Sequence, residues 1–475
     1  MHNKLFYLLS GLFVAVLTCS CALQSGKQLL RKPETFTFKP VQYKVPSPAR
    51  VVLDNGMVLY LLEDHELPLI EMSALIRTGS IYESPDYAGL AALTGDVMRT
   101  GGTETMSPEK IDEALEYIDA RIAVSIETES GSASLSVMQK DFDQGFDIFT
   151  RIIRSPAFAA ERLAIAKEQK IAALRQTNDN PQSLAFRQFK KLLYRGNPRG
   201  NLPTIDSIER IERTDLQRFY QTYFHPNRII LGVSGDFSSA DMIAKIKNSF
   251  GNWKPVDTPL PTVAPPQNSA VLSLNYLQKK MSQSTIILGN LAPKKQSPDY
   301  YAFEIVNYIL GGGGFSSLLT SEIRSNRGLA YSVGSFYRAD VDYGVFGAYC
   351  MTKSVSTAQA LELMFDIIKR MGETNLAGQL KQAKESLINS FIFAYTSSSQ
   401  MVAQTMSLEY DHLPPDFLTL YPAKIEVVTL DDVKRTARNY LHPEQSIVLV
   451  VGNGEALDKS LTRFGPVREI YSDIR

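Results

Sequence analysis

The sequence predicts an α+β protein of two duplicated domains, each of them a sheet covered by helices, and three observations support this. Short motifs recur in the same order along the two halves of the chain. A proline-rich stretch at residues 254–268 separates the halves. Within each half, segments with the alternation of strands are interleaved with segments that have the periodicity of amphipathic helices.

The repeated motifs keep an almost constant offset. The Ser-Pro-Asp-Tyr run at 84–87 returns at 297–300, 213 residues later, and the Tyr-x-His-Pro run at 223–226 returns at 440–443, 217 residues later. Two further pairs keep these offsets: Met138-Gln139-Lys140 with Met351-Thr352-Lys353, and Gly235 with Gly452. One short match would be chance, but four in order indicate an internal duplication.

The pattern predicts the elements of each half. Strands are expected at 57–63, 70–78, 132–138 and 283–289, and short buried strands are expected to close the halves at 229–233 and 447–451. A helix should follow each Ser-Pro-Asp-Tyr turn, with the serine as its cap and the proline in its first turn. Further helices are expected from Ser107-Pro108 and, as amphipathic helices, at 143–153 and 357–371.

The composition is that of an ordinary globular protein. The chain has 475 residues, of which 44% are hydrophobic and 21% are charged. Fifty basic and fifty acidic side chains balance to a net charge of zero. This balance argues against a nucleic-acid-binding role for the chain as a whole, which would need a basic excess.

The N-terminus has the pattern of an export signal. Lys4 precedes an apolar run, residues 5–17, that is too short for a comfortable membrane span. Cys21 resembles the acceptor of a bacterial lipoprotein signal, with Cys19 as the weaker choice, although Thr18 stands where such signals carry leucine. A plainly cleaved signal is the alternative. The expected location is the cell envelope, with the protein lipid-anchored in the periplasm or outer membrane. The remaining Cys350 is expected to be a packed thiol.

These patterns predict five segments. They are a lipoprotein-type signal peptide at 1–21, a tether at 22–48, an N-terminal domain at 49–253, a proline-rich linker at 254–273 and a C-terminal domain at 274–475.

The run at 89–103, after the first Ser-Pro-Asp-Tyr turn, and the order of the elements around it resemble the pitrilysin/insulinase (inverzincin) family of zinc peptidases. The resemblance covers residues 48–465. It implies the processing-peptidase/LuxS-like metallohydrolase fold, in which each domain is a mostly antiparallel sheet covered by helices. In that family the corresponding helix carries His-x-x-Glu-His. The spacing places two imidazoles on one helix face, where they bind zinc beside a glutamate that activates water.

This sequence departs from the motif at every position. The first histidine corresponds to Ala92, the general-base glutamate to Gly95 and the second histidine to Asp96. The third ligand of the family, a glutamate on a later helix, corresponds to Ala173, or to Ala172 if the alignment shifts by one residue. An alanine binds no metal, so no zinc is expected on this chain.

The histidine count gives the same result without an alignment. The five histidines are His2, His65, His225, His412 and His442, and the closest two are 30 residues apart. No two can share a helix turn, so the paired-histidine motif exists nowhere in the chain. His225 and His442 occupy equivalent repeat positions before prolines, which favours a structural role. His65 follows a strand and is expected to be a solvated turn residue.

The second half, in contrast, resembles the family's C-terminal signature. Arg324 and Tyr331 have the spacing of an arginine and a tyrosine that reach toward the scissile carbonyl in the family. Such a pair would orient a peptide and stabilise developing negative charge. The structural alternative is that the arginine pairs with a neighbouring acid and the tyrosine packs at a strand edge. The four glycines Gly311, Gly312, Gly313 and Gly314 belong either to a substrate-selecting loop, as in non-catalytic processing-peptidase subunits, or to a plain turn.

The resemblance therefore implies the non-catalytic subunit of a two-chain zinc peptidase. A homologous partner subunit would carry the zinc, and this chain would help to position peptides or unfolded segments, which bind by adding to a sheet edge. The alternative is an inert binding or scaffold protein, like the core proteins of the respiratory cytochrome bc complex. Hydrolysis by this chain alone through a serine or cysteine is disfavoured, because no Gly-x-Ser-x-Gly elbow is present and no histidine lies near Cys350 in the sequence.

Overall fold

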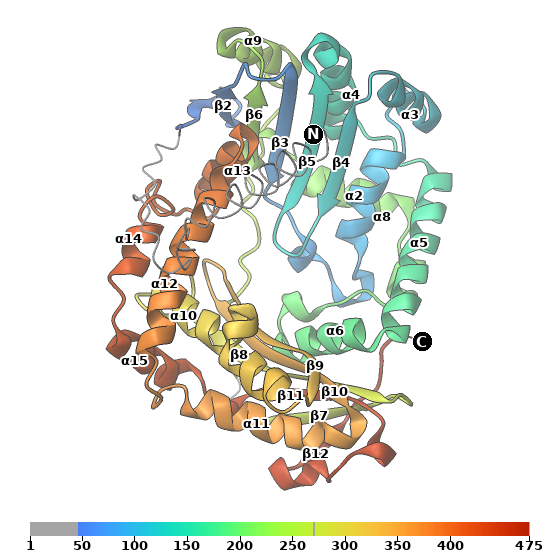
Figure 1. Cartoon of the computed structure of the whole chain (residues 1–475). Coiled ribbons are helices and arrows are strands. Elements are labelled where there is room, and N and C mark those ends of the chain that lie inside the picture. The colour runs from blue at the N-terminus through green and yellow to red at the C-terminus, as the bar shows by residue number, and fades with distance from the viewer. Residues whose placement is uncertain (1–45, 269–270, 475) are drawn as a thin grey trace, which may run out of the picture. The chain divides into compact units, whose positions relative to one another are not determined.

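A computed structural model describes residues 46–268 and 271–474 of the protein, which form one compact unit (Figure 1). The predicted signal peptide, the lipidation site at Cys21 and nearly all of the tether lie outside the described residues. None of the described helices combines the length and apolar character needed to cross a membrane.

The first half forms a six-stranded sheet in the order β1-β2-β6-β3-β5-β4. Its strands are β1 (Ala49–Val52), β2 (Val58–Glu63), β3 (Leu69–Ile76), β4 (Arg121–Ile126), β5 (Gly131–Met138) and β6 (Ile229–Gly235). All neighbouring pairs are antiparallel except β2 and β6, which run parallel. The strand β4 lies at one edge of this sheet.

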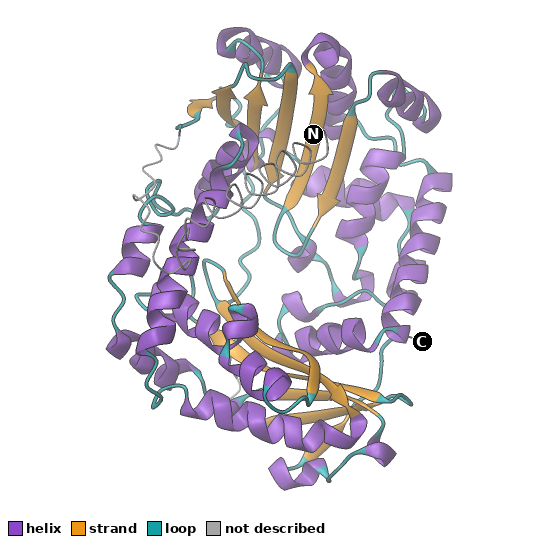
Figure 2. Cartoon of the chain, viewed as in Figure 1, coloured by secondary structure: helices purple, strands orange, loops and turns teal. Residues whose placement is uncertain are grey.

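The second half repeats this arrangement in a sheet of order β12-β7-β11-β8-β10-β9. Its strands are β7 (Ser273–Gln278), β8 (Gln283–Ala292), β9 (Ala330–Ala339), β10 (Gly344–Lys353), β11 (Ile447–Gly452) and β12 (Val467–Glu469). Only the pairs that β7 makes with β11 and β12 are parallel. Five strands of each sheet therefore share one order, and the predicted fold of two duplicated, mostly antiparallel sheets with helices is confirmed (Figure 2).

The helices surround the two sheets. In the first half they are α2 (Leu90–Thr100), α3 (Pro108–Tyr117), α4 (Phe142–Arg154), α5 (Ala160–Asp179), α6 (Pro181–Leu193), α7 (Ile205–Arg210), α8 (Arg213–Tyr223) and α9 (Ser239–Phe250). In the second half they are α10 (Tyr300–Asn307), α11 (Thr357–Arg370), α12 (Ala377–Phe391), α13 (Ser398–Tyr410), α14 (Tyr421–Glu426) and α15 (Leu430–Tyr440). The amphipathic helices predicted at 143–153 and 357–371 are α4 and α11. Each half has a large apolar core between its sheet and its own helices.

The predicted serine cap of the first motif helix is wrong. Residues 85–87 form a short 3-10 turn, and α2 begins only after Gly89, whose φ of 104° is left-handed. The side chain of Ser84 caps nothing there. The carboxylate of Glu83 takes this place, because it accepts hydrogen bonds from the backbone N–H groups of Gly89 and Ala91 at the start of α2. At Ser107 the expected cap is present, since its Oγ accepts from the Lys110 N–H at 3.4 Å.

The short buried strands predicted to close the two halves at 229–233 and 447–451 are β6 and β11; β6 is the last strand of the first half, whereas the short β12 follows β11 in the second. Both lie inside their sheets, parallel to one neighbour and antiparallel to the other. Every residue of β11, and all but the last of β6, is buried. A strand buried on both faces has a continuous apolar sequence, so a second layer must cover each sheet opposite its own helices.

That second layer is exchanged between the halves. The helix α6 of the first half packs on the second sheet, where Leu184 and Phe189 join Ile287 and Leu449 in one apolar cluster. The ring of Phe189 lies so close to the second sheet that a methyl group at Gly289 would be 2.8 Å from its Cζ. Periodicity alone could not bring this cluster together, because Leu184 lies about 100 residues before Ile287, and Leu449 lies about 160 residues after it.

The helix α13 of the second half makes the matching contact with the first sheet. Val402 and Met406 pack against Tyr60 and Ile230 of β2 and β6. Both ends of α13 lie 217 residues after the ends of α6, so the two helices are repeat equivalents. Figure 1 shows α13 against the first sheet and α6 against the second. The duplication therefore includes a reciprocal exchange of helices.

Polar contacts hold the end of α13 in place. The Glu409 carboxylate binds Arg50 of β1, with an Nη2–Oε1 distance of 2.6 Å, and accepts a hydrogen bond from the Tyr60 hydroxyl at 2.5 Å. The hydrogen bond from Arg50 is the main cause that lowers the pKa of Glu409 to about 2, while its partial burial opposes the shift. The next residue, Tyr410, donates its hydroxyl hydrogen to the Glu129 backbone carbonyl at 2.6 Å.

Two equivalent hairpin turns also meet between the halves. Glu129 lies in the turn between β4 and β5, and Tyr343 lies in the corresponding turn between β9 and β10. The Tyr343 hydroxyl donates to Glu129 Oε1 at 3.1 Å. The buried Arg199 binds the same carboxylate, and its guanidinium carbon lies 4.8 Å from the centroid of the Tyr343 ring. These contacts connect the two halves at a second place.

The proline-rich stretch follows the surface without helix or strand through residue 268. It is held by hydrogen bonds from Arg228 Nη2 to the Thr258 carbonyl at 2.7 Å and from Asn197 Nδ2 to the Ala264 carbonyl at 2.8 Å. The domain boundaries placed on either side of it stay a prediction of the sequence. Cys350 is fully buried in β10, as expected of a packed thiol, and burial raises its pKa to about 12.

The exchange predicts that α6 stabilises both halves together. Phe189→Ala is expected to lower the free energy of unfolding by about 3–5 kcal/mol, because it empties a buried aromatic site between the halves. Urea denaturation followed by circular dichroism should still show a single transition. Phe393→Ala, at a side chain that is 70% exposed, is the control and should change stability by less than about 0.5 kcal/mol. A small effect of Phe189→Ala, or two separate transitions, would contradict this role.

Candidate functional site

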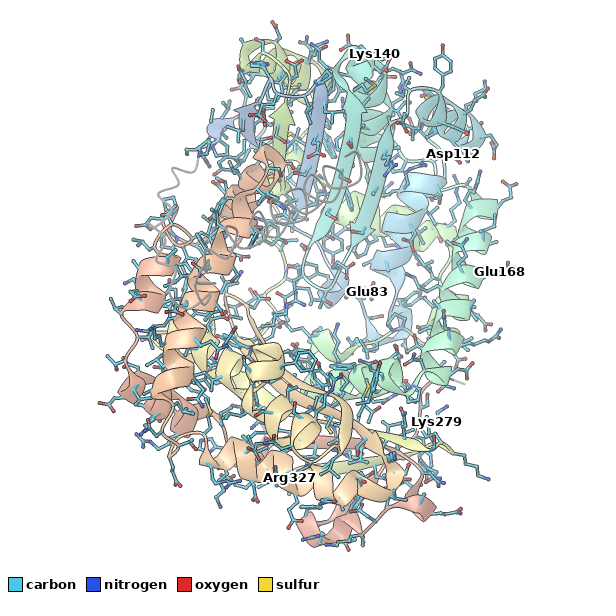
Figure 3. All side chains as sticks on the ribbon, in the orientation of Figure 1. Glu83, Asp112, Lys140, Glu168, Lys279 and Arg327 are labelled. Atoms are coloured by element: carbon cyan, nitrogen blue, oxygen red, sulfur yellow. The ribbon has the colours of Figure 1, made fainter. Side chains whose placement is uncertain are left out.

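The helix α2 carries three of the positions that correspond to the zinc motif. Figure 3 labels Glu83 at the end of α2 where the helix begins. This glutamate is only 7% exposed, and burial raises its pKa to about 7, although the two backbone hydrogen bonds that it accepts act in the opposite direction. The start of α2 is therefore fixed by a buried carboxyl group that lies outside the motif itself.

Asp96 and Ala173 are brought together. Both line a cavity of about 480 Å³ between α2, the edge strand β4 and the long helix α5. Ala92 does not line this cavity. The positions that correspond to the second and third ligands therefore line one cavity, but only Asp96 has a side chain that could bind a cation.

The cation that faces Asp96 comes from the chain itself. Lys170 lies three residues before Ala173 on α5, and its Nζ is 3.4 Å from Asp96 Oδ2. Both side chains are partly exposed, so the ion pair contributes at most about 1 kcal/mol to stability. Its consequence is chemical, because an ammonium group beside this carboxylate repels a second cation. The sequence analysis missed Lys170, although its spacing from Ala173 places both on one helix face.

Gly95, at the position of the general base, packs directly against the strand β4. A methyl group on its Cα would lie 3.1 Å from the Ile126 backbone nitrogen and 3.2 Å from the Ser125 Cα. These distances are shorter than ordinary van der Waals contacts, so any side chain at 95 would require the strand to move. The close approach of α2 and β4 depends on this glycine.

Two arginines complete the charged lining of the cavity. Arg99 donates from Nε to the Ile122 carbonyl at 2.9 Å and pairs through Nη1 with Asp112 of α3, also at 2.9 Å. Arg162 of α5 pairs with Glu109 at 3.0 Å. Figure 3 labels Asp112 on α3 beside this region. The Ile122 carbonyl of the edge strand β4 therefore already accepts a hydrogen bond from Arg99.

The residues of this cavity do not fit a zinc ion. Zinc in proteins takes three or four ligands from histidine, cysteine and carboxylate side chains. Asp96 is the only such residue in the cavity lining. Within residues 46–268 and 271–474, no group of three or more His, Cys, Asp or Glu side chains could hold a metal ion. His65 is bound instead to Asp236, with an Nδ1–Oδ1 distance of 2.6 Å, and is largely exposed as expected.

Arg324 and Tyr331 lie together in the second half. Arg324 belongs to a π-helical turn, Thr320–Ser325, and Tyr331 lies near the start of the edge strand β9. The guanidinium carbon of Arg324 is 5.9 Å from the centroid of the Tyr331 ring and 4.9 Å from that of Phe315. Both rings are exposed, at 78% and 72%. We call these three residues the arginine–aromatic cluster.

The expected alternative for Arg324, a pair with a neighbouring acid, is not seen among the described residues. Glu322, the nearest acid in the sequence, is bound by Arg327 and accepts from Asn326 Nδ2 at 3.5 Å. Figure 3 labels Arg327 in this part of the second half. Phe315 was not expected from the sequence, where only its place directly after the glycine run could have indicated it.

The four glycines have different roles. Gly311 and Gly312 end a second π-helical turn, Tyr308–Gly312, and a methyl group at Gly311 would lie 2.3 Å from the Ser335 backbone nitrogen of β9. Gly311 therefore allows the turn to approach the edge strand. Gly314 has a left-handed φ of 65° with open space around it. Single π-helical turns are rare and concentrate at functional sites; here one of them contains Arg324 and the other ends shortly before Phe315.

The packing of Gly95 can be tested by whether Gly95→Ala raises or lowers the stability of the protein. A helical Gly→Ala change at an open position raises stability by about 0.5–1 kcal/mol. Gly95→Ala should instead lower it by about 1–2 kcal/mol, because the new methyl group presses on the backbone of β4. Gly378→Ala on α12, where nothing lies within 4 Å, is the matched control and should be stabilising. Thermal unfolding of both variants measures this, and equal gains would contradict the close packing.

The buried Glu83 predicts a pH dependence. Its pKa is about 7 in the folded chain against 4.5 when exposed, so the folded protein binds more protons between these values. Its contribution to stability is therefore fully present below pH 4.5 and is lost as the pH rises through 7, by about 3 kcal/mol in total. The difference in unfolding free energy between the wild type and Glu83→Gln should fall accordingly across that window. A difference that stays constant or rises with pH would be the contrary result.

The chain is similar to known protein families, to curated relatives and to solved structures. Residues 62–204 match the family model of insulinase (peptidase family M16), and residues 210–387 match that of the peptidase M16 inactive domain. The chain is 25% identical over 402 residues to a protein of Helicobacter pylori named non-peptidase homolog YmxG, covering 82% of this chain and 90% of that protein. It is 23% identical over 400 residues to an uncharacterized zinc protease of Rickettsia felis, covering 81% and 93%.

A solved structure has the same fold. The peptidase M16 inactive domain from Pseudomonas fluorescens superposes with a TM-score of 0.79 at 23% sequence identity, over 87% of this chain and 99% of that one. The two family models follow one another along most of the chain. The chain belongs to the insulinase family of peptidases, family M16, as a member that lacks the family's zinc motif.

Proposed function

We propose that this chain is the non-catalytic, substrate-positioning subunit of a heteromeric zinc metallopeptidase that acts on peptides or unfolded segments. One contrast carries the proposal. The zinc position of the first half holds the Asp96–Lys170 ion pair, whereas Arg324 and Tyr331 of the second half lie side by side with exposed rings and no acid bound to the arginine. A chain of this kind needs a partner for hydrolysis, and it can contact the substrate through Arg324 and Tyr331.

In this proposal the zinc and the general base belong to a homologous partner subunit. The contribution of this chain would be to orient the peptide and to stabilise negative charge that develops on the scissile carbonyl. A guanidinium and a phenol are suitable groups, because both donate hydrogen bonds to an oxyanion. The name non-peptidase homolog, given to the Helicobacter pylori relative, agrees with a chain that does not cleave peptides by itself.

An extended substrate would bind by adding a strand to a sheet edge. The strands β4 and β9 hold equivalent edge positions in the two sheets. On β4 the Ile122 carbonyl is already bound by Arg99, so part of this edge is occupied. On β9 the edge begins beside the arginine–aromatic cluster. We therefore place the substrate contact of this chain on β9.

The N-terminal sequence supports a location at the cell envelope. An export signal followed by Cys21 would anchor the complex to a membrane through lipid, in the periplasm or at the outer membrane. The partner would then be found in the same membrane fraction.

The first test is a native pull-down from detergent-solubilised membranes, followed by mass spectrometry. We expect a stoichiometric partner of similar size that carries His-x-x-Glu-His. A homodimer, or a partner unrelated to peptidases, would instead support the inert scaffold and would contradict the proposal.

The second test measures peptidase activity of the purified pair. Arg324→Ala and Tyr331→Phe should each lower kcat/KM by at least about 100-fold, because the first removes the cation that orients the peptide and the second removes a donor to the developing oxyanion. Assembly, measured by size-exclusion chromatography, should be unchanged. Arg370→Ala is the control, since among the described residues this exposed side chain donates only to the Asp366 carbonyl of its own helix. Wild-type rates in both site variants would remove these residues from the mechanism.

A further inference from the structure

The arginine–aromatic cluster has a geometry that indicates which chemical group it binds. The guanidinium of Arg324 faces two aromatic rings, those of Phe315 at 4.9 Å and Tyr331 at 5.9 Å. Ring contacts of this kind use the flat faces of a guanidinium, which leaves the N–H groups in its plane available. Among the described residues, none accepts a hydrogen bond from the guanidinium of Arg324 or forms an ion pair with it.

The local sequence keeps the arginine without a counter-ion. Glu322 is the only acid in the π-helical turn of Arg324, and Arg327 binds both its carboxylate and its backbone carbonyl, the latter at 2.8 Å. The one acid that could neutralise Arg324 locally is therefore already paired. An arginine that is held by rings and kept from its nearest acid is ready to accept an external anion.

The shape of the group selects among anions. A planar guanidinium binds a carboxylate through two parallel hydrogen bonds, which is stronger and more directional than one bond to a neutral carbonyl. The surroundings favour an anion that belongs to an apolar molecule, because the two aromatic rings are 72% and 78% exposed and can contact it. Next to them, the hydroxyls of Ser316 and Ser317 are used internally, as donors to the Gly313 and Gly314 carbonyls.

We propose that the arginine–aromatic cluster binds a carboxylate of an otherwise apolar peptide, with Arg324 as the carboxylate ligand and Phe315 and Tyr331 as its aromatic supports. This rests on the proposed function, since it names the class of peptide that the positioning subunit selects. Phe315 becomes a specificity-determining residue. The carboxylate is either the C-terminus of the peptide or an acidic side chain, and the two sources share the same chemistry.

The test is a fluorescence-anisotropy titration of the full-length mature chain. The probes are a fluorescein-labelled peptide of alanine, valine and leucine with a free C-terminus, its C-terminal amide, and the same amide with one internal glutamate. We expect the free acid to bind about 10–100-fold more tightly than the amide, the loss that follows removal of a charge-assisted pair. Recovery of affinity by the internal glutamate would identify the side chain as a source, and no recovery would restrict the site to a C-terminus. Both results support the proposal.

Variants separate the roles of the three residues. Arg324→Lys keeps the charge but loses the planar fork, so the preference for the acid should fall to about threefold or less. Phe315→Ala should weaken binding of the acid, and Tyr331→Phe should leave the preference intact because the ring remains. Arg370→Gln is the matched control and should behave like the wild type. Unfolding temperatures of all variants should stay close to the wild-type value, since the cluster is exposed.

The outcomes that overturn the proposal differ from those that overturn the function. Equal binding of acid and amide, with loss of both in Arg324→Ala, would reject the carboxylate while leaving a peptide-positioning role intact. An unchanged preference in Arg324→Ala would reject Arg324 as the ligand. Failure of every peptide to bind, with and without a zinc-bearing partner, would reject the positioning function together with this inference.

Discussion

Each sheet of this protein buries one face under a helix that belongs to the other half of the chain. The helix α6 covers the second sheet and α13 covers the first, and both occupy the same place in the repeat. Because α5 continues directly into α6 at Asn180, the helix that carries Lys170 and Ala173 is held at one end by the second sheet. The exchange therefore fixes the wall of the motif cavity as well as the relation between the halves.

This frame explains how the fold tolerates the loss of the zinc ligands. Its apolar clusters and the contacts of Glu409 and Glu129 lie away from the motif positions, so no part of the frame needs a metal to hold it. At the motif itself, α2 is fixed by Glu83 at its start and by the packing of Gly95 on β4. Lys170 balances the one charge that remains. Contacts within the chain therefore stabilise the region that corresponds to the zinc site.

Sequence reasoning succeeded where contacts are local or repeated. The duplication, the buried strands β6 and β11, and the amphipathic α4 and α11 follow from periodicity, and the absence of paired histidines needs only a count. It failed where partners are remote. The exchange joins residues such as Phe189 and Leu449 that no periodicity connects, and β4 and β9 were not identified although each forms one edge of its sheet. The cap at Ser84 failed because a competing acceptor, Glu83, already binds the start of α2.

The arginine–aromatic cluster cannot be explained by the needs of the fold. Rings that are 72% and 78% exposed bury little apolar surface, and a guanidinium stacked on exposed rings gains only about 0.5–1 kcal/mol per contact. Meanwhile the cluster lies beside two π-helical turns, which are a rare form of helix. The nearest acid, Glu322, is turned to Arg327 and does not stabilise Arg324. A local arrangement that contributes so little to stability is better accounted for by a ligand than by packing.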